Sequence, residues 1–435
     1  MSTVASGTSA DSLMTSTDAA DSSDTLANVY LKTRSFTDRI TRTLSAEDCM
    51  VQSMDDASPT RWHLAHTTWF FETFVLKDQP DYRVFDEAFG YLFNSYYNTI
   101  GDQYPRHRRG LISRPGLETI REYRSHVDRA IRDAFDSNSL TNAQLALVQT
   151  GIQHEQQHQE LILTDIKHAL SCSPLWPKYD DLPFEPARTA TENWIDVPSG
   201  LVTIGQQGEG FSFDNESPVH EVHLMGTRLA GDLVTCGEYR EFIDDGGYER
   251  PELWLSMGWN AVQTNGWRSP LYWLQQNGAW LTFTLAGLVP LNDDWPVCHI
   301  SLFEADAYAR WRGMRLPTEF EWEAAAKSER NRSATRNEQP FADQLVDRGF
   351  AIHPTRSPDT LMGSVWQWTS SSYAAYPGYR PPPGAVGEYN GKFMCNQYVL
   401  RGGSVATSSD HIRTTYRNFF PADTRWQFTG IRLAK

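Results

Sequence analysis

The most constraining feature of this sequence is a long segment, residues 141–170, in which apolar positions recur at helical spacing. Leu147, Gly151, His154 and His158 follow one another at intervals of four and three, which predicts a helix with one inward-facing side. Positions i and i+4 share a helix face, so the two histidines can present their imidazole nitrogens to one point. A helix of this kind buries its inward side against other helices, and the segment therefore predicts a helical bundle.

A second predicted helix, residues 59–77, carries another histidine on its apolar side. A Ser-Pro pair at its start supplies an N-cap and a first-turn proline. His66 lies in the apolar stripe of this helix, and His63 lies near the edge of the stripe. A buried imidazole needs a partner, which is more often a hydrogen bond than a metal. Three histidines from two helices favour a metal site, although Glu160 beside two histidines would also make a metal-binding triad.

The connection over residues 78–115 is long for a compact domain, and loops of this length are often functional. It carries a tyrosine pair, Tyr96 and Tyr97, which simple core packing would also explain. Arg106 and Arg109 follow. In an acidic protein, clustered arginines are either a solvated loop or a clamp for a carboxylate, because guanidinium matches carboxylate in a bidentate way.

Composition limits the classes of function. A length of 435 residues favours two domains. The net charge of −15 argues against nucleic-acid and anionic-membrane partners. The sequence has no apolar run that is long enough to predict a membrane span. The five cysteines are widely spaced and form no CxxC pair, which is typical of a reduced, cytoplasmic protein.

The order of segments predicts an α+β chain. Residues 1–24 are small and polar and are expected to be a disordered tail. Residues 25–172 form the helical bundle, and the proline-rich residues 173–192 form a linker. Residues 193–435 combine alternating strands, short helices and long loops rich in Gly, Trp and Asn.

Two family resemblances add to this interpretation. The second half resembles the formylglycine-generating-enzyme-like domain, a variant of the C-type lectin fold. The motifs that carry this resemblance are Val197-Pro-Ser-Gly200, Ser217-Pro-Val-His-Glu-Val222, Arg315-Leu-Pro-Thr-Glu-Phe-Glu-Trp-Glu323, Gly363-Ser-Val-Trp-Gln-Trp-Thr369 and Leu400-Arg-Gly-Gly-Ser404. The copper-binding cysteine pair of the formylglycine-generating enzymes has no counterpart here. The first half resembles a DinB-like four-helix bundle, whose metal site consists of three histidines.

The combination of these two domains resembles the sulfoxide synthases of ergothioneine biosynthesis, on three motifs: Leu64-Ala-His-Thr-Thr-Trp-Phe-Phe-Glu72, His154-Glu-Gln-Gln-His-Gln-Glu160 and Tyr416-Arg-Asn-Phe-Phe-Pro421 with Arg425-Trp-Gln-Phe-Thr-Gly-Ile-Arg432. The resemblance implies a non-haem iron(II) enzyme that uses dioxygen. It would join a thiol sulfur to carbon 2 of the imidazole of hercynine (Nα-trimethylhistidine) and leave a sulfoxide.

The resemblance also implies roles for individual residues. The iron ligands match His66, His154 and His158, so that Glu160 becomes a supporting residue rather than a ligand. Gln157 matches a contact to the hercynine imidazole. The stretch beside the trimethylammonium group matches Asn418, Phe419 and Phe420, and aromatic rings attract such a cation through their faces.

The loop Asn94-Ser-Tyr-Tyr-Asn98 resembles the subtype that uses free cysteine. Tyr97 matches the catalytic proton or hydrogen donor, with Tyr96 beside it. Arg106 and Arg109 match the residues that hold the carboxylate of the thiol substrate. The expected partners are therefore the small molecules hercynine and cysteine.

Four alternatives remain open at this point. The thiol donor could be γ-glutamylcysteine, or the enzyme could take a selenium donor and form selenoneine. A zinc-dependent DinB-like thiol transferase or hydrolase would use a similar bundle. A non-catalytic binding module would keep the histidines in a structural role.

Overall fold

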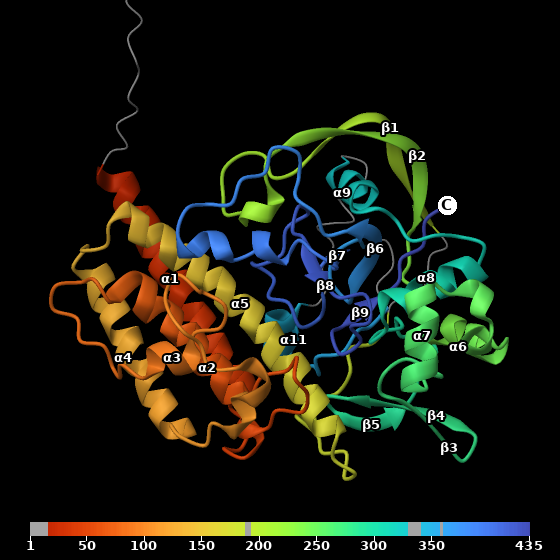
Figure 1. Ribbon diagram of the computed structural model, residues 1–435, viewed down its shortest axis with the longest axis horizontal. Coiled ribbons are helices and arrows are strands. Elements are labelled where there is room, and N and C mark those ends of the chain that lie inside the picture. The colour runs from red at the N-terminus through yellow and green to blue at the C-terminus, as the bar shows by residue number, and fades with distance from the viewer. Residues whose placement is uncertain (1–15, 188–192, 329–340, 357–359) are drawn as a thin grey trace, which may run out of the picture.

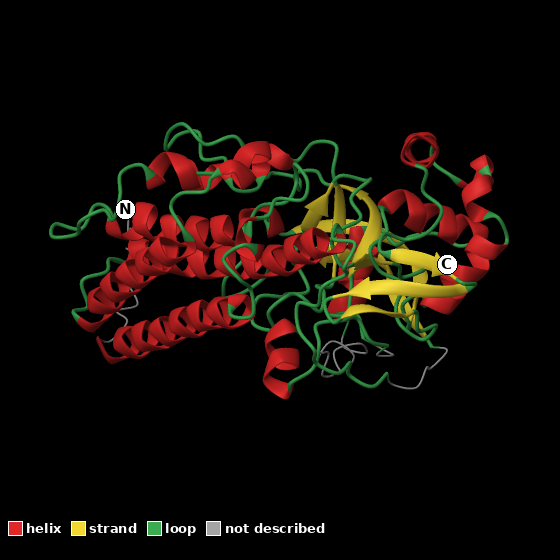
Figure 2. Cartoon of the chain, turned by 90° about the horizontal axis from the view of Figure 1, so that it is seen from below, coloured by secondary structure: helices red, strands yellow, loops and turns green. Residues whose placement is uncertain are grey.

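The computed structural model describes residues 16–187, 193–328, 341–356 and 360–435. The long helices lie side by side in one half of the molecule, and the strands lie in the other half together with several shorter helices (Figures 1 and 2). This is the α+β arrangement that the sequence predicts.

The first half is a four-helix bundle made of α1 (Ser16–Thr41), α2 (Thr60–Phe71), α4 (Leu117–Asp136) and α5 (Asn142–Ser171). The helices of the pairs α1–α5, α2–α5, α2–α4 and α1–α4 contact one another. Thr141 opens α5 with a capping box, in which its side chain accepts from the Gln144 N–H while the Gln144 side chain accepts from the Thr141 N–H. Gly151 brings α5 close to α2, because a Cβ at this position would lie 2.5 Å from a ring carbon of Phe71.

Three details of the first half differ from the prediction. Helix α1 begins at Ser16, inside the predicted tail, because an existing helix extends by one hydrogen bond per residue without a new nucleation step. The first fifteen residues of that tail lie outside the described part. Helix α2 continues as a π-helical turn, Glu72–Leu76. The connection over 78–115 contains α3 (Phe89–Phe93) and a 3₁₀ helix, Arg106–Leu111.

The second half contains three small sheets. Strands β1 (Trp194–Ile204) and β2 (His220–Ala230) form an antiparallel ribbon, and β3 (Trp273–Gln276), β4 (Ala279–Thr284) and β5 (Gly287–Pro290) form a meander. The third sheet has the order β8-β7-β6-β9, with bounds Asn418–Phe420, Tyr398–Arg401, Trp366–Ser372 and Thr429–Gly430. Around the sheets lie α6 (Cys236–Asp244), α7 (Ser256–Asn265), α8 (Leu302–Trp311), α9 (Glu319–Lys327) and α11 (Ala342–Arg348).

The two halves share one continuous buried apolar cluster, which contains Tyr30 and Trp69 of the bundle as well as Trp366 and Phe428 of the second half. Helix α5 contacts both halves (Figure 1), and its Gln157, Glu160 and Lys167 bond to residues of the second half. No helix in the described ranges is both long enough and apolar enough to cross a membrane.

Candidate metal centre and cavity

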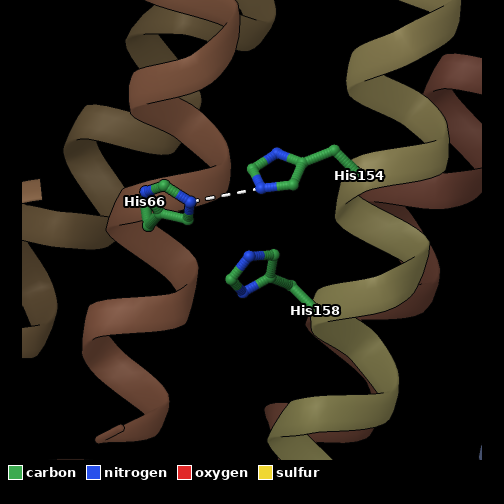
Figure 3. A group of neighbouring side chains, drawn as sticks. All are labelled: His66, His154 and His158. Atoms are coloured by element: carbon green, nitrogen blue, oxygen red, sulfur yellow. Dashed lines mark hydrogen bonds between the residues drawn. The ribbon is translucent and has the colours of Figure 1, made fainter. Parts of the chain in front are cut away.

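Three buried histidines converge from two helices (Figure 3). His66 comes from α2, and His154 and His158 come from α5. One nitrogen of each imidazole lies within 4.8 Å of the corresponding nitrogens of the other two. The Nε2 atoms of His66 and His154 are 3.2 Å apart. The structure therefore brings together the three histidines that the sequence proposes as ligands.

The surroundings of the cluster suit a divalent metal ion. Burial, with the neighbouring histidines, lowers the pKa of His66 and His158 well below the usual value, and burial lowers the pKa of His154 to about 3. All three rings are therefore neutral at physiological pH and keep a lone pair for a metal. His66 is oriented by its Nδ1–H, which donates to the carbonyl of Phe93 at 2.6 Å. Its Nε2 then points at the cluster as an acceptor, and three neutral imidazoles are a donor set that first-row divalent metals accept.

Glu160 is not part of this cluster. Its carboxylate accepts from Trp366 Nε1 at 2.6 Å, Ser404 Oγ at 2.6 Å and Thr407 Oγ1 at 2.9 Å. These three donors belong to the second half of the chain, so Glu160 ties α5 to that half. Burial raises the pKa of this carboxyl above its usual value.

A cavity of about 370 Å³ lies beside the histidines, between the bundle and the second half. His154 and His158 form part of its wall. Seven further predicted site residues line it: Tyr96, Arg106, Arg109, Gln157, Asn418, Phe419 and Phe420. Two predicted residues, His66 and Tyr97, do not.

The tyrosine pair is arranged in two layers. Tyr96 lines the cavity, and Tyr97 is fully buried behind it with its ring stacked on Tyr96 at 4.7 Å between centroids. Tyr97 also packs against the rings of Trp69 and Phe74. Burial raises the pKa of both phenols, so each keeps its proton at neutral pH.

The second half holds the tyrosine loop in place. The carboxylate of Glu388 accepts from the N–H groups of Asn98 at 3.1 Å and Thr99 at 2.9 Å, and from the Thr99 hydroxyl. Lys392 donates to the carbonyl of Tyr96 and pairs with Glu388 at 2.9 Å. Desolvation would raise the pKa of Glu388, but the hydrogen bonds from Thr99 and Lys392 outweigh it and lower the pKa to about 2.

The two arginines differ in their surroundings. Arg109 is buried, its guanidinium carbon lies 3.4 Å from the centroid of the Trp62 ring, and its Nη1 donates to Ser58 Oγ at 2.9 Å. Among the residues that the structure describes, its Nε has no hydrogen-bond partner and no carboxylate lies within ion-pair distance of it. Burial, with the nearby Arg106, lowers the pKa of Arg109. Arg106 is exposed and donates to the carbonyl of Asp56.

Gln157 is held by two tyrosines of the second half that sequence analysis did not select. Its Nε2 donates to Tyr416 Oη at 2.6 Å, and its Oε1 accepts from the hydroxyl of Tyr389. Tyr416 lies in a motif that carried the family resemblance, so a signal for it existed. Tyr389 follows a proline- and glycine-rich loop without periodicity, and only the fold brings it to α5.

The far wall of the cavity is aromatic. Asn418, Phe419 and Phe420 form β8, the edge strand of the four-stranded sheet. The Phe419 ring stacks on Tyr373 at 4.0 Å and faces Phe393 at 6.0 Å. Such a wall suits a large, weakly hydrated cation.

Comparison with known proteins identifies similar chains. Residues 180–354 and 359–435 match the family model described as the sulfatase-modifying factor enzyme 1-like domain. The chain is 32% identical over 409 residues to the hercynine oxygenase of Mycolicibacterium smegmatis, a match that covers 87% of this chain and 91% of the relative. It is 31% identical to the hercynine oxygenase of Mycobacterium tuberculosis, with the same two coverages. It is also 24% identical to the formylglycine-generating enzyme of Thermomonospora curvata, over 59% of this chain and 98% of that enzyme.

Proposed function

Because the chain belongs to the hercynine oxygenase family, we propose that it is an iron(II)-dependent sulfoxide synthase acting in ergothioneine biosynthesis. It joins the sulfur of cysteine to carbon 2 of the hercynine imidazole, consumes dioxygen and releases hercynylcysteine sulfoxide. The observation that carries the proposal is that histidines, a buried arginine and an aromatic wall meet at one cavity.

His66, His154 and His158 would hold the iron. Bound there, a ferrous ion supplies the redox chemistry with dioxygen that forms the carbon–sulfur and sulfur–oxygen bonds. The chain itself supplies neutral ligands, so the full charge of the metal remains available to favour a thiolate.

Hercynine would lie between Gln157 and β8. The side-chain carbonyl of Gln157 accepts from Tyr389, and one of its amide hydrogens is donated to Tyr416. The other amide hydrogen remains for an imidazole nitrogen of the substrate. The trimethylammonium group would then rest near Phe419 and Phe420, whose ring faces attract a quaternary cation.

Cysteine would bind through its carboxylate at Arg109 and Arg106. Arg109 is the stronger anchor, since its Nε has no partner among the described residues and its ring-stacked guanidinium is fixed in direction. The tyrosine pair would provide the proton that the oxygen chemistry requires. Tyr97 is the donor that the family resemblance proposes, and Tyr96 is the phenol that reaches the cavity wall.

The decisive experiment uses the full chain loaded with iron(II) under anaerobic conditions. Hercynine and cysteine are added, oxygen is admitted, and the product mass is measured. Parallel reactions replace cysteine with γ-glutamylcysteine or with a selenosugar. An oxygen-dependent sulfoxide formed preferentially with cysteine supports the proposal. Absence of a coupled product with all three donors refutes the synthase function, and a preference for another donor refutes the assignment of cysteine.

A further inference from the structure

A buried chain of hydrogen bonds leads to one of the three cluster histidines. His63 lies one helical turn before His66 and is 2% exposed. Its Nδ1 is 2.8 Å from Nδ1 of His158, and its Nε2 is 3.0 Å from Oδ2 of Asp165. Asp165 lies seven residues after His158 on α5 and is 5% exposed. The same face of α5 thus carries a cluster histidine and the carboxylate at the end of the chain.

The direction of each hydrogen bond follows from the carboxylate. Asp165 Oδ2 also accepts from the backbone N–H of Ser58, at 2.8 Å. A carboxylate only accepts, so His63 donates from Nε2; its Nδ1 accepts in the arrangement that leaves the Nε2 lone pair of His158 free for a metal. His158 must then donate from Nδ1. Its lone pair is left on Nε2, which becomes the atom available to a metal.

The orientations of the other two cluster histidines do not depend on this series of hydrogen bonds. His66 is oriented by the carbonyl of Phe93. His154 has a buried Nδ1 with no partner among the described residues. For His158, His63 is the residue that bonds its Nδ1. Its tautomer is therefore set by His63 and, through it, by Asp165.

We propose that His63 and Asp165 are positioning residues that hold His158 in the tautomer whose Nε2 faces the metal site. The inference rests on the proposed function only in assuming that the three histidines bind a divalent metal. This series of hydrogen bonds also extends toward the proposed cysteine site, because Ser58 accepts from Arg109 through its side chain and donates to Asp165 through its backbone.

The test is a titration of the metal-free, full-length protein with Co²⁺ under anaerobic conditions, followed by the visible absorption of the bound ion. His63→Phe keeps a ring in place but removes the acceptor, and it should weaken binding roughly 10- to 100-fold, as loss of a partner to a ligating histidine does. His63→Asn can accept from His158 Nδ1–H through its side-chain oxygen and should recover most of the affinity. His168→Asn is the matched control, since this α5 histidine bonds to Ser53 and takes no part in the hydrogen bonds that link His158, His63 and Asp165.

Two results would overturn the inference. If His63→Phe binds Co²⁺ as tightly as the wild type, His63 does not orient a ligand. If His63→Asn loses as much affinity as His63→Phe, the ring matters for packing rather than for its acceptor nitrogen.

A second pair keeps the test decisive if His63→Phe does not fold. Asp165→Asn retains an oxygen that can accept from His63 and Ser58, whereas Asp165→Ala retains none. We expect weak Co²⁺ binding for the alanine variant and near-normal binding for the asparagine variant. Equal behaviour of the two refutes the role of Asp165 as acceptor. Failure of the wild type to bind Co²⁺ would instead refute the proposed metal site itself.

Discussion

Arg109→Ala is the substitution for which the structure predicts the most selective loss of function. Among the described residues, Arg109 is a buried cation without an ion pair, and its Nε is a donor without a partner. Proteins rarely keep such a group unless a ligand satisfies it. The Trp62 ring and Ser58 fix the plane of the guanidinium, so its open edge is preorganised for a carboxylate.

The magnitude follows from the hydrogen bonds that would be lost. A hydrogen bond to a charged group contributes about 1.5–3 kcal/mol, and alanine at this buried position offers no replacement donor. The loss of the carboxylate contact should therefore raise the apparent KM for cysteine roughly 10- to 150-fold. The KM for hercynine should change little, because Gln157 and β8 are held by residues of the second half.

The assay measures product formation while one substrate is varied at a saturating concentration of the other. Arg109→Lys serves as a second variant, since lysine keeps the charge but loses the planar fork and the stacking on Trp62. It should fall between the wild type and Arg109→Ala. Arg106→Ala should also affect cysteine more than hercynine, but less than Arg109→Ala, because Arg106 is exposed. Equal increases in both KM values for Arg109→Ala would show that the arginine is structural and would refute the clamp.

Three further outcomes are expected. Tyr97→Phe should shift the products from carbon–sulfur coupling toward oxidation of the thiol alone. The same product analysis of Tyr96→Phe shows whether the phenol at the cavity wall is the donor instead. An unchanged ratio of the two products in Tyr97→Phe would show that Tyr97 is not the donor. The pKa of Glu388 is about 2 in the folded chain, below its usual value near 4.5, so the stability it contributes is present above about pH 4.5 and is lost as the pH falls toward 2. Thermal unfolding of Glu388→Gln should therefore depend less steeply on pH in that range than unfolding of the wild type, and identical slopes would contradict this. Gly151→Ala should lower the free energy of unfolding by about 1–3 kcal/mol, because the new methyl group would clash with the Phe71 ring of α2. Gly90→Ala should not lower it, because a Cβ there meets nothing within 4 Å. Equal chemical denaturation curves for the two variants would refute the close approach of α5 to α2.

The helical half was accessible to sequence reasoning because its signals are local. The periodicity over 141–170 corresponds to α5 (Asn142–Ser171), and the helix predicted over 59–77 corresponds to α2 (Thr60–Phe71) with its π-helical turn (Glu72–Leu76). The convergence of His66 with His154 and His158 also followed from spacing, since two inward faces of one bundle must meet. The choice of His66 rather than Glu160 as the third ligand came from the family resemblance. Spacing alone did not decide whether the Glu160 carboxylate is a ligand.

The parts that sequence reasoning missed depend on long-range contacts. Nothing near Glu160 indicates that Ser404, Thr407 and Trp366 will satisfy its carboxylate. The layering of the tyrosine pair was also inaccessible. Two adjacent tyrosines in a loop look equivalent, and only the packing of Trp69 and Phe74 around one ring decides which phenol is buried.

The contacts of α5 explain why the site needs both halves of the chain. One side of this helix holds His154 and His158 against α2, while Gln157 and Glu160, on neighbouring positions, bond to the second half. A change in the angle between the halves would move the aromatic wall, with the Tyr389 and Tyr416 hydroxyls that hold Gln157, relative to the histidines. The three hydrogen bonds to Glu160 resist that movement, since each joins a group on α5 to a buried group of the sheet-bearing half. Glu160 therefore contributes to the geometry of the cavity without belonging to the metal cluster, because its carboxylate ties the helix that carries His154 and His158 to the half that carries the aromatic wall.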